Sequence, residues 1–270
     1  MVRKLYKHEF AAWLRVLPFF WVAMLGVAVA GRFVQIFENI GSAYYWILFA
    51  SSLLTAFLAA MALLAAPTVF GIFRFYRNLF TGEGYLSFTL PVTPGQHLLV
   101  KITTAVCFDL ASVAVLLVSA CILTCGDMLT ELLKAGFYLL RQIPQDMILH
   151  VVGYCIQYII WILLGCLCNH LMYYSCICIG QLLRKNRILG SVGVYFGYQL
   201  IGQVFSTGVS LLFTLFGIVG ILDKLVEIIE KYPNATMHIT LGIGGVLTLA
   251  LAVIFWLVCH IIIRKRLNLE

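Results

Sequence analysis

The stretch that decides the fold is Arg74–Lys101, with the sequence RFYRNLFTGEGYLSFTLPVTPGQHLLVK. It is the longest polar interruption in the first half of a very apolar chain. The Gly82–Gly84 segment signals a turn, and Pro91 and Pro94 prevent one helix from running through the stretch. Because apolar runs lie on both sides, we predict a short amphipathic helix and a turn at a membrane surface, joining two membrane-spanning helices.

The composition predicts a membrane protein. Of the 270 residues, 63% are hydrophobic and only 11% are charged, whereas a soluble domain has about 25% charged residues. A water-soluble fold of this size could not cover its surface with so little charge. We therefore expect an all-α polytopic membrane protein with a single transmembrane domain over residues 1–270. The formal net charge is +7, but the basic residues fall at helix ends, so no nucleic-acid partner is expected.

Six apolar segments are long enough to cross the ~30 Å hydrocarbon core. They cover about residues 16–36, 44–73, 98–124, 147–183, 188–221 and 239–263. Residues 1–17 precede them, with basic and apolar side chains at helical spacing, and predict an amphipathic helix on the membrane surface. A cleaved signal peptide is the alternative, but cleavage would remove the first span. Residues 127–146 also have one apolar face and predict a second interfacial helix.

The distribution of basic residues predicts the orientation. An even number of spans places both termini on one side of the membrane. Most of the 18 Lys and Arg residues fall at the two termini and in the loops on that same side. The positive-inside rule therefore predicts a multi-pass plasma-membrane protein with both termini and the loop at residues 74–97 in the cytoplasm.

The pattern FYRNLF-x-GEGYL-x-FTLPVTPGQ, followed by Lys101, resembles the first cytoplasmic loop of ABC transporter permeases of the type-2 exporter class. The length and layout of the whole chain resemble the short six-helix permeases of Gram-positive bacteria. In that family this loop carries the helix that docks on the ATPase. The matching positions here are Arg74, Phe75, Tyr76, Arg77, Phe80, Glu83 and Tyr85. The alternative from the residues alone is an ordinary basic cytoplasmic loop.

The resemblance implies a permease subunit of an ATP-driven exporter in a bacterial membrane. Its expected partners are membrane lipid, a separate ABC ATPase subunit that binds ATP and Mg, and a second permease subunit, identical or related. This chain has no Gly-x-x-x-x-Gly-Lys-Ser/Thr loop and no catalytic triad or metalloprotease motif. We therefore expect neither an enzyme nor a cofactor in this chain, with hydrolysis on the partner.

Asp109 is the acidic residue predicted deepest inside a span, so it is a candidate for an ion or proton site. The alternative is a structural hydrogen bond to a polar group such as His170, Gln199 or Gln203. A rival function is a secondary transporter or channel that uses Asp109 without an ATPase. A third is a non-transport membrane scaffold or immunity protein.

Two further patterns lie in the later spans. Cys168, His170 and their neighbouring thiols suggest soft-metal ligands, but helical geometry places Cys166 and His170 on nearly the opposite side from Cys168, so no metal site is expected. Gly193 and Gly197 form a small-xxx-small motif, which permits close packing either within the chain or between two copies.

Overall fold

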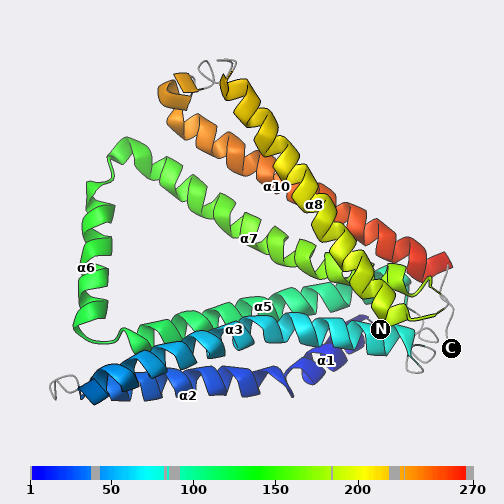
Figure 1. Ribbon diagram of the computed structural model, residues 1–270, viewed down its shortest axis with the longest axis horizontal. Coiled ribbons are helices and arrows are strands. Elements are labelled where there is room, and N and C mark those ends of the chain that lie inside the picture. The colour runs from blue at the N-terminus through cyan, green and yellow to red at the C-terminus, as the bar shows by residue number, and fades with distance from the viewer. Residues whose placement is uncertain are drawn as a thin grey trace. The chain divides into compact units, whose positions relative to one another are not determined.

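The computed structural model describes residues 2–37, 43–81, 84, 92–183, 185–218, 226–227 and 229–265. Its elements are helices throughout these ranges, and those given bounds are α1 (Val2–Trp13), α2 (Leu17–Gln35), α3 (Ala43–Phe80), α5 (Pro94–Leu123), α6 (Asp127–Gln142), α7 (Gln145–Gly180), α8 (Arg187–Ile218) and α10 (Pro233–Lys265) (Figure 1). Six of them, α2, α3, α5, α7, α8 and α10, are long and apolar enough to cross a membrane. The predicted all-α polytopic fold is confirmed.

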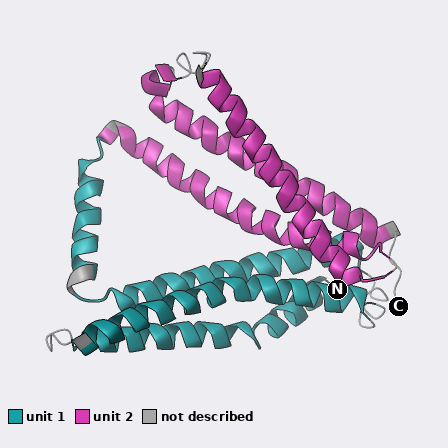
Figure 2. Ribbon diagram, viewed as in Figure 1, with its two compact units in different colours: residues 1–144 teal, residues 145–270 magenta. Residues whose placement is uncertain are grey.

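The helices form two compact units, residues 1–144 and residues 145–270 (Figure 2). In the first, α2 packs against α3 and α5, while α5 also contacts α3 and α1. In the second, α7 packs against both α8 and α10. The predicted single domain over the whole chain stays a prediction, and each unit is described by itself below.

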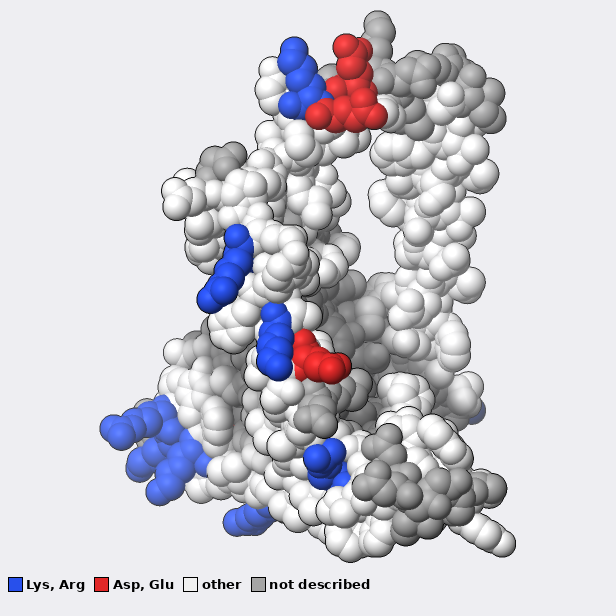
Figure 3. Space-filling model, turned by 90° about the vertical axis from the view of Figure 1, so that its left-hand side faces the viewer, with Lys and Arg blue, Asp and Glu red and all other residues white. Residues whose placement is uncertain are grey.

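The spans expose most of their apolar surface. In each span, no more than 22% of the most apolar 18-residue segment is buried. Leu149, for example, is 79% exposed. On the face shown in Figure 3, the described residues are mostly neither acidic nor basic. Such a surface is stable only against lipid or another apolar partner, which fits a multi-pass membrane protein.

Helix α3 differs from the prediction. A span over residues 44–73 was expected to be followed by a separate short amphipathic helix, but the structure has one helix. It runs unbroken for 38 residues to Phe80 and contains Pro67. At 1.5 Å per residue it is roughly 57 Å long, well beyond the ~30 Å hydrocarbon core. Its last turns lack a helix breaker, and Phe75, Leu79 and Phe80 are buried. Tertiary packing therefore stabilises the helical conformation of residues 74–80, although this segment is polar in sequence.

Helix α5 begins at Pro94, so the loop predicted at residues 74–97 also ends earlier than expected. Thr93 is the N-cap residue, and its hydroxyl accepts a hydrogen bond from the backbone N–H of Gln96. The Gln96 side chain in turn accepts from the Thr93 backbone N–H, which completes a capping box, and Pro94 occupies the first turn. The connection between α3 and α5 is thus limited to residues 81–93, of which 82–83 and 85–91 lie outside the described residues.

Among the remaining boundaries, α1 ends at Trp13, four residues before the predicted end at residue 17, and α10 also differs from expectation. This helix begins at Pro233, six residues before the predicted span, because residues 233–238 contain no breaker after the proline. At the turn between α5 and α6, Gly126 adopts φ +116°, which favours glycine, and an added Cβ would lie 2.8 Å from Nη2 of Arg32.

Candidate functional site

The inner face of α1 positions an acidic side chain inside the first unit. Tyr6, Glu9, Phe10 and Trp13 recur at three- and four-residue spacing and therefore share one helix face. Tyr6 forms a 2.8 Å hydrogen bond with Thr103 of α5. The basic residues of α1 are exposed on other faces. The predicted amphipathic helix is present, and its apolar face contacts protein.

Glu9 is only 3% exposed and contacts two cations from two different helices. Its Oε1 accepts a hydrogen bond from Nζ of Lys101 at 2.8 Å, and Asn78 Nδ2 lies 3.4 Å from the same oxygen. Its Oε2 accepts from Nε of Arg74. Lys101 is itself 5% exposed. We call Glu9, Arg74, Asn78 and Lys101 the Glu9 cluster. It links α1, α3 and α5.

The electrostatics of the cluster favour the charged carboxylate. Burial acts to raise the pKa of Glu9, but the charges of Lys101 and Arg74 and their hydrogen bonds outweigh it, so the pKa lies below its usual value. Glu9 therefore stays ionised, and it compensates the charge of the deeply buried Lys101.

An aromatic core next to the cluster joins the same three helices and also α2. Phe108 of α5 stacks on Trp13 at a centroid distance of 5.2 Å and on Trp21 at 6.0 Å. Trp13 also meets Phe70 of α3 edge-on at 5.1 Å. The indole of Trp21 donates a 3.0 Å hydrogen bond to Ser112, so its polar atom is satisfied. The end of α3 is therefore held by both charge and packing.

The structure separates the predicted ATPase-coupling residues. Arg74 belongs to the Glu9 cluster, whereas Phe75 and Phe80 are 0% and 8% exposed and lie in contact with each other. Their predicted role in docking the ATPase stays a prediction, and little of their surface is exposed to a partner. Tyr76 is half-buried and Arg77 is exposed. The remaining predicted coupling residues, Glu83 and Tyr85, lie outside the described residues.

The predicted polar residues of the spans fall in different units. Asp109 is half-buried on α5 of the first unit. His170 is fully buried on α7 of the second unit, 6.1 Å from the ring of Tyr174, and Gln203 is exposed on α8. The structure thus leaves the suggested hydrogen bond of Asp109 to His170 or Gln203 a prediction.

Gly193 and Gly197 make no close contact with the described residues of the second unit. A Cβ added at either position would meet no atom within 4 Å. Close packing of the motif is therefore absent within the second unit, and packing elsewhere in the chain or between two copies stays a prediction. The close approach in the second unit lies instead at Gly180, where an added Cβ would come within 2.5 Å of the Ser191 backbone nitrogen.

We expect Gly180→Ala to destabilise the second unit by about 1–3 kcal/mol, because a rigid backbone would have to shift. The matched control is Gly197→Ala, for which we expect no loss and a slight gain from helix propensity. Cys178 and Cys259 are fully buried, so their reaction with a maleimide dye on heating measures unfolding, in a background without the exposed cysteines. Equal transitions for both variants would contradict the close contact.

A second polar cluster joins the beginnings of α7 and α10. His150 Nδ1 lies 3.2 Å from His238 Nε2, and His238 Nδ1 lies 2.8 Å from Oε1 of Gln157. The ring of Tyr154 stacks on His238 at 4.3 Å, while its hydroxyl donates to Oδ1 of Asn234 at 3.1 Å. This cluster was not predicted from the sequence. The available signal was that residues 150, 154 and 157 fall on one face of a helix.

Glu9 was also missed as a site residue. Its signal is an acidic side chain on the apolar face of a basic amphipathic helix, an arrangement that requires a cationic partner once the face is buried. Within the described residues, no group of three or more His, Cys, Asp and Glu side chains has a geometry that could hold a metal ion.

Comparison with known proteins gives no match to a protein-family model, to a curated protein or to a solved structure. The resemblance of residues 74–101 to a permease loop therefore rests on the quoted residues alone.

Proposed function

We propose that this chain is the permease subunit of an ATP-driven exporter of the ABC type, coupled through the end of α3 to a separate ATPase subunit. The observation that carries the proposal is the continuity of α3. One helix of 38 residues exceeds the thickness of the hydrocarbon core, and the Glu9 cluster fixes its projecting end to α1 and α5.

This arrangement suits the transmission of a displacement. Residues 81–93 connect the end of α3 to the beginning of α5. The end of α3 is packed through Phe75 and Phe80, and the beginning of α5 is stabilised by the capping box at Thr93. A partner that moves this connection would move α3 and α5 together, and α1 with them. A connection between frayed helix ends would absorb the same displacement.

The partners follow from the proposal. ATP and Mg would bind to the ATPase subunit, and a second permease subunit would complete the translocation pathway in a bacterial plasma membrane with cytoplasmic termini. The open surface at Gly193 and Gly197 is a candidate contact for that second subunit.

Tyr76 and Tyr85 provide the test of docking, because Tyr76 is only half-buried and Tyr85 is the other tyrosine among the predicted coupling residues. We expect Tyr76→Ala/Tyr85→Ala to weaken ATPase binding by about 2 kcal/mol or more, the usual cost of losing aromatic anchors. The matched control is Tyr44→Ala at the other end of α3, where the side chain is 78% exposed. The measurement is the amount of native ATPase that co-purifies per permease, with transport assayed in the same vesicles.

Unchanged docking and transport in the double variant would make residues 81–93 a simple connector. The half-buried Asp109 favours the rival, a transporter driven by an ion gradient. Purified chain in liposomes separates the two: gradient-driven uptake without any ATPase, abolished by Asp109→Asn, would replace the exporter proposal. Absence of transport in both assays would favour a scaffold or immunity role.

A further inference from the structure

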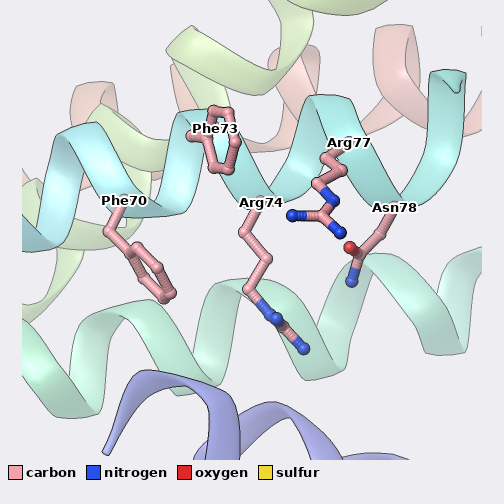
Figure 4. Close-up of a pocket in the computed structure, with 5 residues that line it drawn as sticks. All are labelled: Phe70, Phe73, Arg74, Arg77 and Asn78. Carbon is pink, nitrogen blue, oxygen red and sulfur yellow. The ribbon is translucent and has the colours of Figure 1, made fainter. Parts of the chain in front are cut away.

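A pocket lies on α3 beside the Glu9 cluster. Its volume is about 170 Å³, and it is lined by Phe70, Phe73, Arg74, Arg77 and Asn78. These positions follow three- and four-residue spacing, so they form one side of the last turns of α3 (Figure 4). The phenylalanines lie toward the middle of the helix and the polar side chains toward its end, so the pocket changes from apolar to basic along α3.

Arg74 uses only part of its guanidinium for Glu9. The carboxylate accepts from Nε, and the described residues include no acceptor for the two terminal amino groups. These groups carry four N–H donors in a planar fork, the geometry that matches an oxyanion with two acceptor oxygens. Since the Arg74 side chain is 22% exposed at the pocket, an anion from outside the protein can reach it.

The apolar end of the pocket distinguishes between anions. Phe73 is 57% exposed and Phe70 is half-buried, so an occupant would touch aromatic surface as well as arginine. A free phosphate ion gains nothing from that surface, whereas the acyl chains of a phospholipid do. The exposed basic side chains of α1, Arg3, Lys4 and Lys7, lie in the same unit and add positive potential for an anionic headgroup.

We propose that this pocket binds the phosphate group of an anionic phospholipid, with Arg74 and Arg77 facing the phosphate and the acyl chains lying along Phe70 and Phe73. The bound lipid would brace the end of α3 where the Glu9 cluster already joins it to α1 and α5. The inference does not depend on the proposed coupling, because the site lies within this chain and requires no ATPase.

The test uses the full chain, purified without an ATPase. Native mass spectrometry measures retained lipid after addition of phosphatidylglycerol, or of phosphatidylcholine with the same acyl chains, and thermal unfolding is followed with each lipid and with inorganic phosphate. We expect tighter binding of phosphatidylglycerol and no stabilisation by inorganic phosphate. Arg77→Gln should weaken phosphatidylglycerol binding about tenfold, the effect of one lost charge-assisted hydrogen bond. Arg15 is an exposed arginine in the turn between α1 and α2, and Arg15→Gln is the matched control that should bind as the wild type does.

Three outcomes would overturn the inference. Equal binding of the two lipids would remove the anionic specificity, and equal loss in Arg77→Gln and Arg15→Gln would reduce the effect to general surface charge. If Arg77→Gln left lipid binding intact but, in a separate purification from native membranes, abolished recovery of the ATPase, the pocket would instead be a docking site for an acidic protein segment. Because Arg77 is exposed and outside the Glu9 cluster, the variant should fold, and an unchanged thermal transition without lipid checks this.

Discussion

Replacing Glu9 with glutamine is expected to lower the free energy of unfolding of the first unit by about 3–5 kcal/mol, the usual cost of removing one partner of a buried ion pair. Glutamine keeps the shape of the side chain but leaves the charge of Lys101, 5% exposed, without its carboxylate. Trp13 and Trp21 both stack on Phe108 beside the cluster. In a background in which the other three tryptophans are phenylalanine, their emission reports thermal unfolding of this region in detergent.

The double variant Glu9→Gln/Lys101→Met separates the loss of a charge from the loss of a contact. A methionine of similar length removes the buried cation, so most of the stability should return, since a buried pair is often replaceable by apolar side chains. Arg3→Gln, an exposed cation on the same helix, should change stability by less than about 0.5 kcal/mol. A double variant no more stable than Glu9→Gln alone would show that the ion pair is not the source of the effect.

Acid titration gives an independent check on the same residue. Because the folded-state pKa of Glu9 is lowered, its stabilisation is fully present above the ordinary glutamate pKa of about 4.3. It is lost as the pH falls through the lower pKa of the folded protein. The Glu9→Gln variant should lack this part of the acid sensitivity.

The membrane spans could be predicted from the sequence because about 20 consecutive apolar residues leave few alternatives to a spanning helix. The ends of the helices were predicted less well. At α3 and α10 no breaker marks the boundary, and packing or an N-terminal proline extends the helix beyond its apolar run. At α5 the Thr93–Gln96 capping box is visible in the sequence and fixes the beginning locally.

The Glu9 cluster could not be predicted because its members lie far apart in the chain. Glu9 and Lys101 are separated by 92 positions, and periodicity within one helix does not indicate which other helix supplies the counter-ion. The burial of Phe75 and Phe80 could not be predicted for a related reason. Aromatic residues interleaved with arginine are typical of protein interfaces, but the same side chains are as readily buried in a core. Only the packing of α3 against its neighbours decides between these environments.

Removing the indole of Trp13 should destabilise the first unit by about 3–5 kcal/mol, the usual cost of truncating a buried aromatic residue to alanine. Trp13 is 2% exposed and contacts Phe108 and Phe70, so it joins α1 to both α5 and α3. Lipid can replace water around apolar side chains, but it cannot fill a cavity between three helices, so the lost packing is not recovered in a membrane.

Leu14→Ala is the matched control for Trp13→Ala. Leu14 follows Trp13 in the chain, but its side chain is 53% exposed, so we expect a change below about 0.5 kcal/mol. Trp21 remains in both variants. With Trp46, Trp161 and Trp256 replaced by phenylalanine, the midpoint of the emission change on heating compares the two variants. A helix that lies on the membrane surface through its apolar side chains would be weakened by either substitution. A large loss for Trp13→Ala alone therefore indicates that α1 is an integral part of the first unit, and similar losses for both would contradict the packing of Trp13 on Phe108.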